Sequence, residues 1–120
     1  MVTEVGLQDL ERALQDGALL LDVRESAEYA EGHVPGARLL PLSVLPVGMH
    51  ELPRDQPVYV VCQAGGRSAQ AAELLTTVGV DARSVSSGTA AWVGSGRPSE
   101  TGTPRAEPSA PQPEGEAPAR

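Results

Sequence analysis

The chain has 120 residues, enough for one domain with one modest hydrophobic core, and it contains no Phe and a single Trp. Its only cysteine excludes an internal disulfide. The formal net charge of −7 comes without any cluster of basic residues, which argues against a nucleic-acid-binding surface and gives no sign of a membrane surface.

The first ten residues include Glu4 and Asp9 and lack the basic flank and apolar stretch of a secretory signal, so we expect a cytoplasmic protein. No apolar run approaches the roughly 20 residues that a membrane-spanning helix needs. No group of Cys and His residues has the spacing of metal ligands, so neither a metal nor another cofactor is expected.

The first expected elements follow from the spacing of apolar residues. Leucines three and four positions apart predict a helix over about residues 7–15, and Gly17 is placed to end it in a left-handed conformation. The apolar run at 18–23 is too short for a buried helix and predicts a central strand. Ser26 is expected to cap the N-terminus of a short helix that runs through Ala30.

Strands and helices continue to alternate along the chain. The remaining expected elements are a strand at 37–40, a weakly patterned helix at 43–50, a strand at 58–61, a helix at 67–78, a strand at 82–85 and a helical turn at 90–93. This alternation is typical of a parallel sheet with helices on both faces. Beyond Val93 there is no Leu, Val, Met or aromatic residue and prolines are frequent, so residues 97–120 are predicted to be a disordered Pro/Ala/Glu-rich tail.

The loop after the strand at 58–61 contains the residues that could bind a substrate or react with it: Cys62, Gln63, Ala64, Gly65, Gly66, Arg67 and Ser68. Ligands bind at the carboxyl edge of a parallel sheet, and a loop that curls from a strand into a helix can direct several backbone N–H groups at one anion. We therefore expect a Cys62 thiol with a lowered pKa, ionised and open to solvent. The two glycines allow the curl, and Arg67 adds a cation. A lone cysteine after an apolar strand is more often an inert buried residue, and only the order of the parts favours a reactive thiol.

Several other polar residues are expected to be structural. Asp22 ends a strand near the expected site and would position the loop or cap a turn. Arg24 is expected to pair with a neighbouring carboxylate such as Glu28. His33 is expected to be a hydrogen-bonded turn residue, and Trp92 to pack against the core.

Three parts of the chain together resemble the rhodanese-like domain family. The similar segments are residues 20–29 and 32–37 for the N-terminal signature, 62–68 for the active-site loop, and Gly88 with Ala91 and Trp92 for the closing motif. The resemblance implies a rhodanese-like α/β domain over residues 3–96, with a central parallel five-stranded sheet flanked by helices on both faces.

For function, the resemblance implies a single-domain, rhodanese-type (thiosulfate) sulfurtransferase. Cys62 would be the catalytic nucleophile that holds sulfane sulfur as a persulfide, and residues 63–68 would bind the substrate, with Asp22 and Arg24 as structural support. The implied partners are a small sulfur donor, either thiosulfate or a protein persulfide, and a thiol or cyanide acceptor, with a sulfur-carrier protein as a candidate. Members that favour thiosulfate often carry cations directly after the cysteine, whereas the two residues there are neutral in this chain, which leaves the physiological donor open.

Two other functions use the same residues. A rhodanese-like binding or regulatory module would keep the fold without turnover and recognise the tail or the thiol of a partner protein. Cysteine-based phosphatases also use a loop from Cys to Arg, but only four residues separate Cys62 from Arg67 where those enzymes use five. The shorter loop should be too tight for a phosphoryl group, and no Asp is placed as a general acid.

Overall fold

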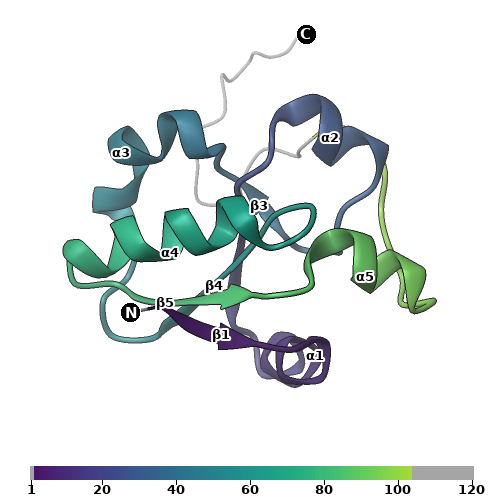
Figure 1. Cartoon of the computed structure of the whole chain (residues 1–120), viewed down its shortest axis with the longest axis horizontal. Coiled ribbons are helices and arrows are strands. Elements are labelled where there is room, and N and C mark those ends of the chain that lie inside the picture. The colour runs from purple at the N-terminus through teal and green to yellow at the C-terminus, as the bar shows by residue number, and fades with distance from the viewer. Residues whose placement is uncertain (1, 104–120) are drawn as a thin grey trace, which may run out of the picture.

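Five strands form the centre of the computed structural model, which describes residues 2–103 (Figure 1). The strands are β1 (Thr3–Val5), β2 (Leu19–Asp22), β3 (Arg38–Leu39), β4 (Pro57–Val61) and β5 (Asp81–Val85). They make one sheet in the order β1-β5-β4-β2-β3, and every neighbouring pair is parallel. This confirms the expected parallel five-stranded sheet, and it places the carboxyl end of β4 at the middle of the sheet edge, where ligands bind in such folds.

Helices in the described part of the chain cover both faces of the sheet. They are α1 (Leu7–Gln15), α2 (Ser26–Glu31), α3 (Leu45–Gly48), α4 (Gly66–Thr77) and α5 (Gly88–Gly94). Residues of α3 and α4 belong to the hydrophobic cluster on one face, and residues of α1, α2 and α5 belong to the cluster on the other. The two-sided arrangement confirms the expectation drawn from the alternating pattern (Figure 1).

The side chains of β4 divide the core into these two layers. Val58, Val60 and Cys62 belong to the cluster beneath α3 and α4, whereas Tyr59 and Val61 belong to the cluster on the opposite face. All five residues are buried. Because successive side chains of a strand point to opposite faces, the register of β4 decides that the cysteine lies on the α4 side.

Three details of the secondary structure differ from the sequence prediction. The edge strand β1 was not expected, because two of its three residues are exposed and it has no apolar run. The helix expected at 43–50 is one α-helical turn between two 3₁₀ turns, with Pro46 in its first turn. The predicted cap Ser26 is wrong: Glu25 is the capping residue of α2, and its N–H donates to Oε1 of Glu28 at 3.0 Å.

The segment 97–103 falls in the tail predicted to be disordered, yet it lies against the domain. Nε1 of Trp92 donates to the carbonyl of Pro98 at 2.7 Å. His33 and Glu100 exchange both backbone hydrogen bonds, at 2.8 and 2.9 Å. Polar contacts rather than apolar burial hold this segment, including the ion pair of Arg97 with Glu11, which is why hydropathy did not predict it. The remainder of the expected tail lies outside the described residues.

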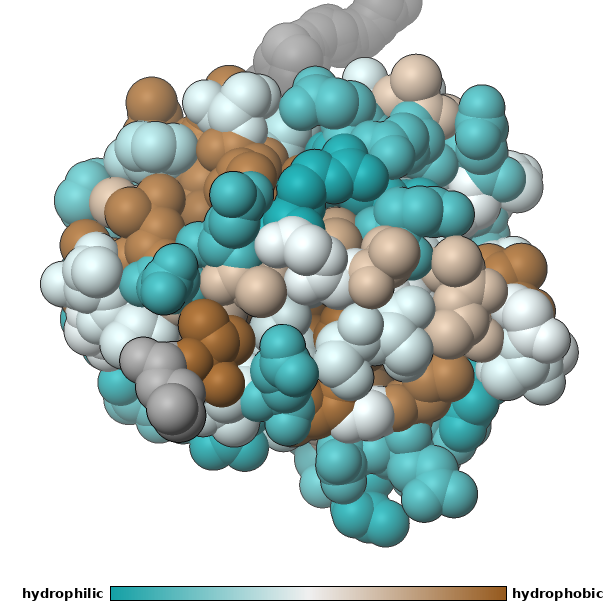
Figure 2. All heavy atoms as spheres, viewed as in Figure 1, coloured by the Kyte–Doolittle hydropathy of each residue, from teal (hydrophilic) through white to brown (hydrophobic). Residues whose placement is uncertain are grey.

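The surface differs in character between α3 and α2. Apolar side chains gather over α3 in Figure 2, whereas the surface over α2 is hydrophilic. Val47 of α3 is 83% exposed, and Val44 in the preceding 3₁₀ turn is 46% exposed. No helix among the described residues is long and apolar enough to cross a membrane.

Candidate active site

Cys62 follows β4 directly, at the carboxyl end of the middle strand of the sheet. Residues 63–65 turn the chain back, and α4 begins at Gly66. The Cys62 residue is 1% exposed, whereas Gln63 and Ala64 beside it are exposed. The expectation of a thiol open to solvent is therefore wrong for this structure, because the alternation along β4 turns the side chain beneath α4.

Hydrogen-bonding groups nevertheless surround the sulfur of Cys62. The N–H of Gly65 donates to Sγ at 3.1 Å, and Oγ of Ser68 lies 3.6 Å from Sγ. Ser68 is buried too, and its hydroxyl lies 2.8 Å from that of Ser84. Burial acts to raise the pKa of Cys62, but hydrogen bonds with Ser68 and with the loop amides outweigh it. The pKa of the thiol is thus below that of an ordinary cysteine, as a nucleophile requires.

Two glycines allow the cysteine loop to lie in backbone contact with the loop between β5 and α5. Gly65 has a φ of +111°, and a Cβ there would lie 2.2 Å from the carbonyl oxygen of Ser86. Gly88 has a φ of +75°, and its Cβ would lie 2.3 Å from the carbonyl oxygen of Gln63. Gly66 is different: a Cβ there would meet nothing within 4 Å, so only the first glycine of the expected pair is required for the curl.

The same close approach gives the carbonyls of the cysteine loop their partners. Thr89 donates its backbone N–H to the carbonyl of Cys62 at 2.8 Å, and Ala90 donates its own to the carbonyl of Gln63 at 3.1 Å. These donors belong to the first turn of α5, where backbone N–H groups have no partner within the helix. The closing motif identified in the sequence therefore holds the cysteine loop by its backbone, while Trp92 of that motif is buried in the core as expected.

Arg67 is paired with a carboxylate of α2. Its two terminal nitrogens donate to the two carboxylate oxygens of Glu28 at 2.7 and 2.8 Å. This bidentate pair lowers the pKa of Glu28 to about 2, chiefly through the hydrogen bonds from Arg67. The expected pairing of Arg24 with Glu28 is wrong, because the loop arginine takes this carboxylate and Arg24 takes another one.

Asp22 and Arg24 form a buried ion pair at the end of β2. Both are almost fully buried, and the guanidinium donates to the carboxylate from Nε and Nη2 at distances of 2.8 to 3.2 Å. The same guanidinium donates to Oε1 of Gln63 at 3.0 Å and to the carbonyl of Gly32 at 2.9 Å. Asp22 therefore orients Arg24, and Arg24 ties the cysteine loop to the end of α2, which is a positioning role.

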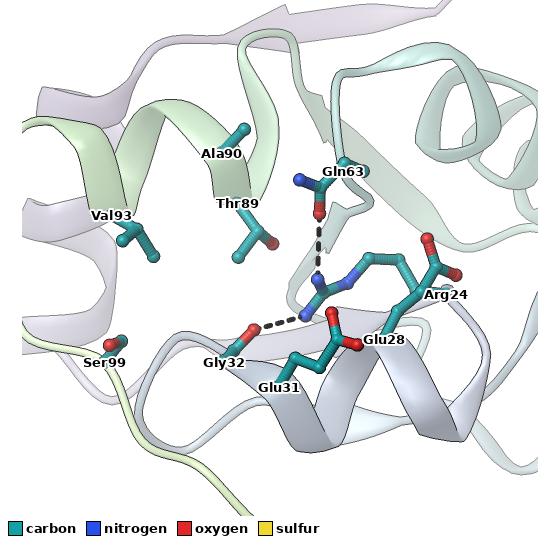
Figure 3. Close-up of a pocket in the computed structure, with 9 residues that line it drawn as sticks. All are labelled: Arg24, Glu28, Glu31, Gly32, Gln63, Thr89, Ala90, Val93 and Ser99. Carbon is teal, nitrogen blue, oxygen red and sulfur yellow. Dashed lines mark hydrogen bonds between the residues drawn. The ribbon is translucent and has the colours of Figure 1, made fainter.

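A pocket with a volume of about 460 Å³ opens beside the cysteine loop (Figure 3). Its lining residues are Arg24, Glu28, Glu31, Gly32, Gln63, Thr89, Ala90, Val93 and Ser99. The walls thus come from α2, the cysteine loop, α5 and the C-terminal segment, and the side chain of Gln63 bonds to Arg24 at one wall, as Figure 3 shows. A pocket of this volume fits a small molecule or a few residues of a peptide.

Two residues of the site were not predicted in these roles. Ser84 is buried on β5 and joins the hydrogen bonds behind Cys62, and no local pattern marked it, because the strand also contains Asp81 and Arg83. Glu28 pairs with Arg67 across a separation of 39 residues, which no local pattern reveals. His33, in contrast, bonds through Nδ1 to the carbonyl of Tyr29 at 2.8 Å, as a structural turn residue does.

The parallel sheet and the cysteine loop define a small α/β domain with one thiol of lowered pKa at the carboxyl edge of its sheet. The family model described as "Rhodanese-like domain" matches residues 6–95, and the chain belongs to this family. This confirms the resemblance seen in its three motifs.

Individual proteins support the same assignment. A protein of Allochromatium vinosum named "Sulfurtransferase" is 37% identical over 101 residues, which cover 82% of this chain and 94% of that protein. The "Putative sulfur carrier protein YrkF" of Bacillus subtilis is 31% identical over 80 residues, which cover 65% of this chain and 43% of that protein. The crystal structure of a rhodanese-related protein from Thermoplasma volcanium superposes with a TM-score of 0.76 at 31% identity and covers 81% of this chain and 96% of its own. Together the family and the relatives support a role in sulfur transfer.

Proposed function

We propose that this protein is a sulfurtransferase that moves sulfane sulfur through a persulfide on Cys62 to a thiol or cyanide acceptor. The observation that carries the proposal is the Cys62 sulfur itself, which accepts a hydrogen bond from the N–H of Gly65 at 3.1 Å and has a lowered pKa although it is buried. A structural cysteine packed only among aliphatic side chains would have a raised pKa instead.

The first step is a displacement at the donor. The Cys62 thiolate attacks the outer sulfur of the donor, a new S–S bond forms, and the leaving group departs with the electron pair of the bond that breaks. With thiosulfate the leaving group is sulfite. The amides that favour the thiolate also favour the negative charge of the resulting persulfide, so the loop serves both states.

The second step returns the enzyme to its starting state. An acceptor thiolate or cyanide attacks the outer sulfur, and Cys62 leaves as a thiolate stabilised by the same donors. Since the chain has one cysteine, the accepting thiol must come from another molecule. A Bacillus subtilis relative is named a putative sulfur carrier protein, which supports a sulfur-related partner, and the pocket beside Gln63 offers such an acceptor a place next to the loop. The cytoplasm keeps thiols reduced and is the proposed compartment.

A turnover assay tests the proposal. The protein is mixed with a sulfane donor and cyanide, and thiocyanate is measured over time. We expect formation that depends on protein concentration and is abolished in Cys62→Ser, whose hydroxyl is a far weaker nucleophile. Absence of thiocyanate with several donors would reject catalysis with this acceptor and favour the alternative, a binding module. In that case a partner should bind wild type and Cys62→Ala equally well.

A further inference from the structure

The guanidinium of Arg67 is already paired with the carboxylate of Glu28. Both terminal nitrogens of Arg67 are bonded to Glu28, and the two side chains are each 36% exposed. An anionic substrate that approaches the Arg67 guanidinium is repelled by the Glu28 carboxylate bound to it. The pair stands at the surface, so an incoming donor and the carboxylate compete for the same two N–H groups.

The carboxylate of Glu28 is also held in place by its own helix. Its Oε1 accepts the backbone N–H of Glu25 at 3.0 Å, in addition to the hydrogen bond from Arg67. The pKa of Glu28, lowered to about 2, keeps it ionised throughout the neutral range. The Glu28 carboxylate, which competes with an anionic donor for Arg67, is therefore charged at neutral pH and already oriented.

No second cation among the described residues of this site can replace Arg67. Arg24 is the guanidinium that lines the pocket, and it is 2% exposed and paired with Asp22. The pocket also carries the carboxylate of Glu31, for which the described part of the chain shows no ion pair. With the thiolate of Cys62 added, the carboxylates and the sulfur outnumber the two cations, and the site is net negative.

We propose that Glu28 is a specificity-determining residue that discriminates against small anionic sulfur donors such as thiosulfate and favours donors without net charge. This inference rests on the proposed function, because it names the class of donor for the same thiol. Reaction with thiosulfate brings a dianion towards a thiolate, forms the bond from Cys62 to the outer sulfur and releases sulfite. A free Arg67 guanidinium would offset the repulsion between thiosulfate and the thiolate. A guanidinium paired with Glu28 does not.

The first measurement compares thiosulfate turnover in matched variants. In Glu28→Gln the side-chain oxygen still accepts the N–H of Glu25, but the negative charge that pairs with Arg67 is removed. We expect kcat/KM for thiosulfate to rise about five- to tenfold, mainly through KM. Glu25→Gln, which removes an exposed charge one helical turn away, should stay within about twofold. The gain should vanish in the double variant Glu28→Gln/Arg67→Gln.

The second measurement needs a nucleophilic thiol but no sulfur transfer, so it separates failure of this inference from failure of the proposed function. Methanethiosulfonates are used, in which the Cys62 thiolate attacks the sulfenyl sulfur and methanesulfinate leaves with the electron pair. The anionic 2-sulfonatoethyl reagent is compared with the neutral methyl reagent. Glu28→Gln should accelerate the anionic reagent about five- to tenfold and the neutral one by less than about twofold, and added salt should reduce the difference.

Three results would overturn the inference. The first is equal acceleration of both reagents in Glu28→Gln, which would show a looser loop instead of a charge effect. The second is an equal gain in Glu25→Gln, which would show general surface electrostatics. The third is an unchanged anionic rate, which would show that Arg67 does not meet the donor. Urea unfolding of each variant verifies that all are folded, and the anionic-to-neutral rate ratio decides the inference even if thiosulfate gives no turnover.

Discussion

Replacement of Gly88 by alanine is the sharpest test of how the cysteine loop is held. Gly88 lies at the start of α5 with a φ of +75°, a conformation that costs a residue with a Cβ about 1–2 kcal/mol. The new methyl group would also lie 2.3 Å from the carbonyl oxygen of Gln63 and 2.8 Å from the backbone nitrogen of Ala64. These neighbours are backbone atoms, so relief of the overlap requires the loop itself to move.

The expected magnitude follows from these two costs. Overpacking of a well-packed region costs about 1–3 kcal/mol, which added to the conformational cost gives a loss of about 2–5 kcal/mol for Gly88→Ala. Gly17→Ala is the matched control, because Gly17 has a φ of +84° but a Cβ there would meet nothing within 4 Å. The control should lose only the conformational part, about 1–2 kcal/mol.

Urea unfolding followed by circular dichroism measures both losses, and the alkylation rate of Cys62 reports on the loop. Gly88→Ala should also slow alkylation at neutral pH, because movement of the loop breaks the hydrogen bonds that favour the thiolate. Gly17→Ala should not change that rate. Equal losses of stability in the two variants, or an unchanged alkylation rate in Gly88→Ala, would refute the inferred backbone contact.

Three further predictions concern the thiol, the buried pair and the C-terminal segment. Ser68→Ala should raise the pKa of Cys62, because a hydrogen bond that lowers it is lost, and the pH profile of alkylation should shift to higher pH; an unshifted profile contradicts the role of Ser68. Asp22→Ala should lower the free energy of unfolding by about 3–5 kcal/mol, because Arg24 keeps a buried charge without its carboxylate; a loss below about 1 kcal/mol in urea would contradict this. Deletion of 97–120 should lower the melting temperature, because the hydrogen bonds that join the segment 97–103 to the domain are lost; an unchanged melting temperature would contradict this.

The elements around the cysteine were predictable because their signals are local. The apolar run of β4 and the glycines after Cys62 placed a strand, a loop and a helix in the right order. The spacing of the leucines gave α1 its bounds, Leu7–Gln15. Such features depend on the period of neighbouring residues, which the sequence displays directly.

The features that sequence reasoning missed depend on contacts between distant parts of the chain. The partner of Arg67 is 39 residues away, and the choice between Asp22 and Glu28 as partners of the two arginines is settled only by how α2 sits against the loop. The burial of Cys62 depends on the register of β4 beneath α4. Pairing of the short strand β1 rests on backbone hydrogen bonds with β5, which leave no trace in hydropathy.

Intact-mass spectrometry of the protein after exposure to a sulfane donor shows whether Cys62 takes up sulfur. We expect that wild type gains the mass of one sulfur atom, that a reducing thiol removes it, and that Cys62→Ser gains nothing. A wild-type protein that stays unmodified with every donor, or a Cys62→Ser variant that still takes up sulfur, would contradict the assignment of Cys62 as the sulfur carrier.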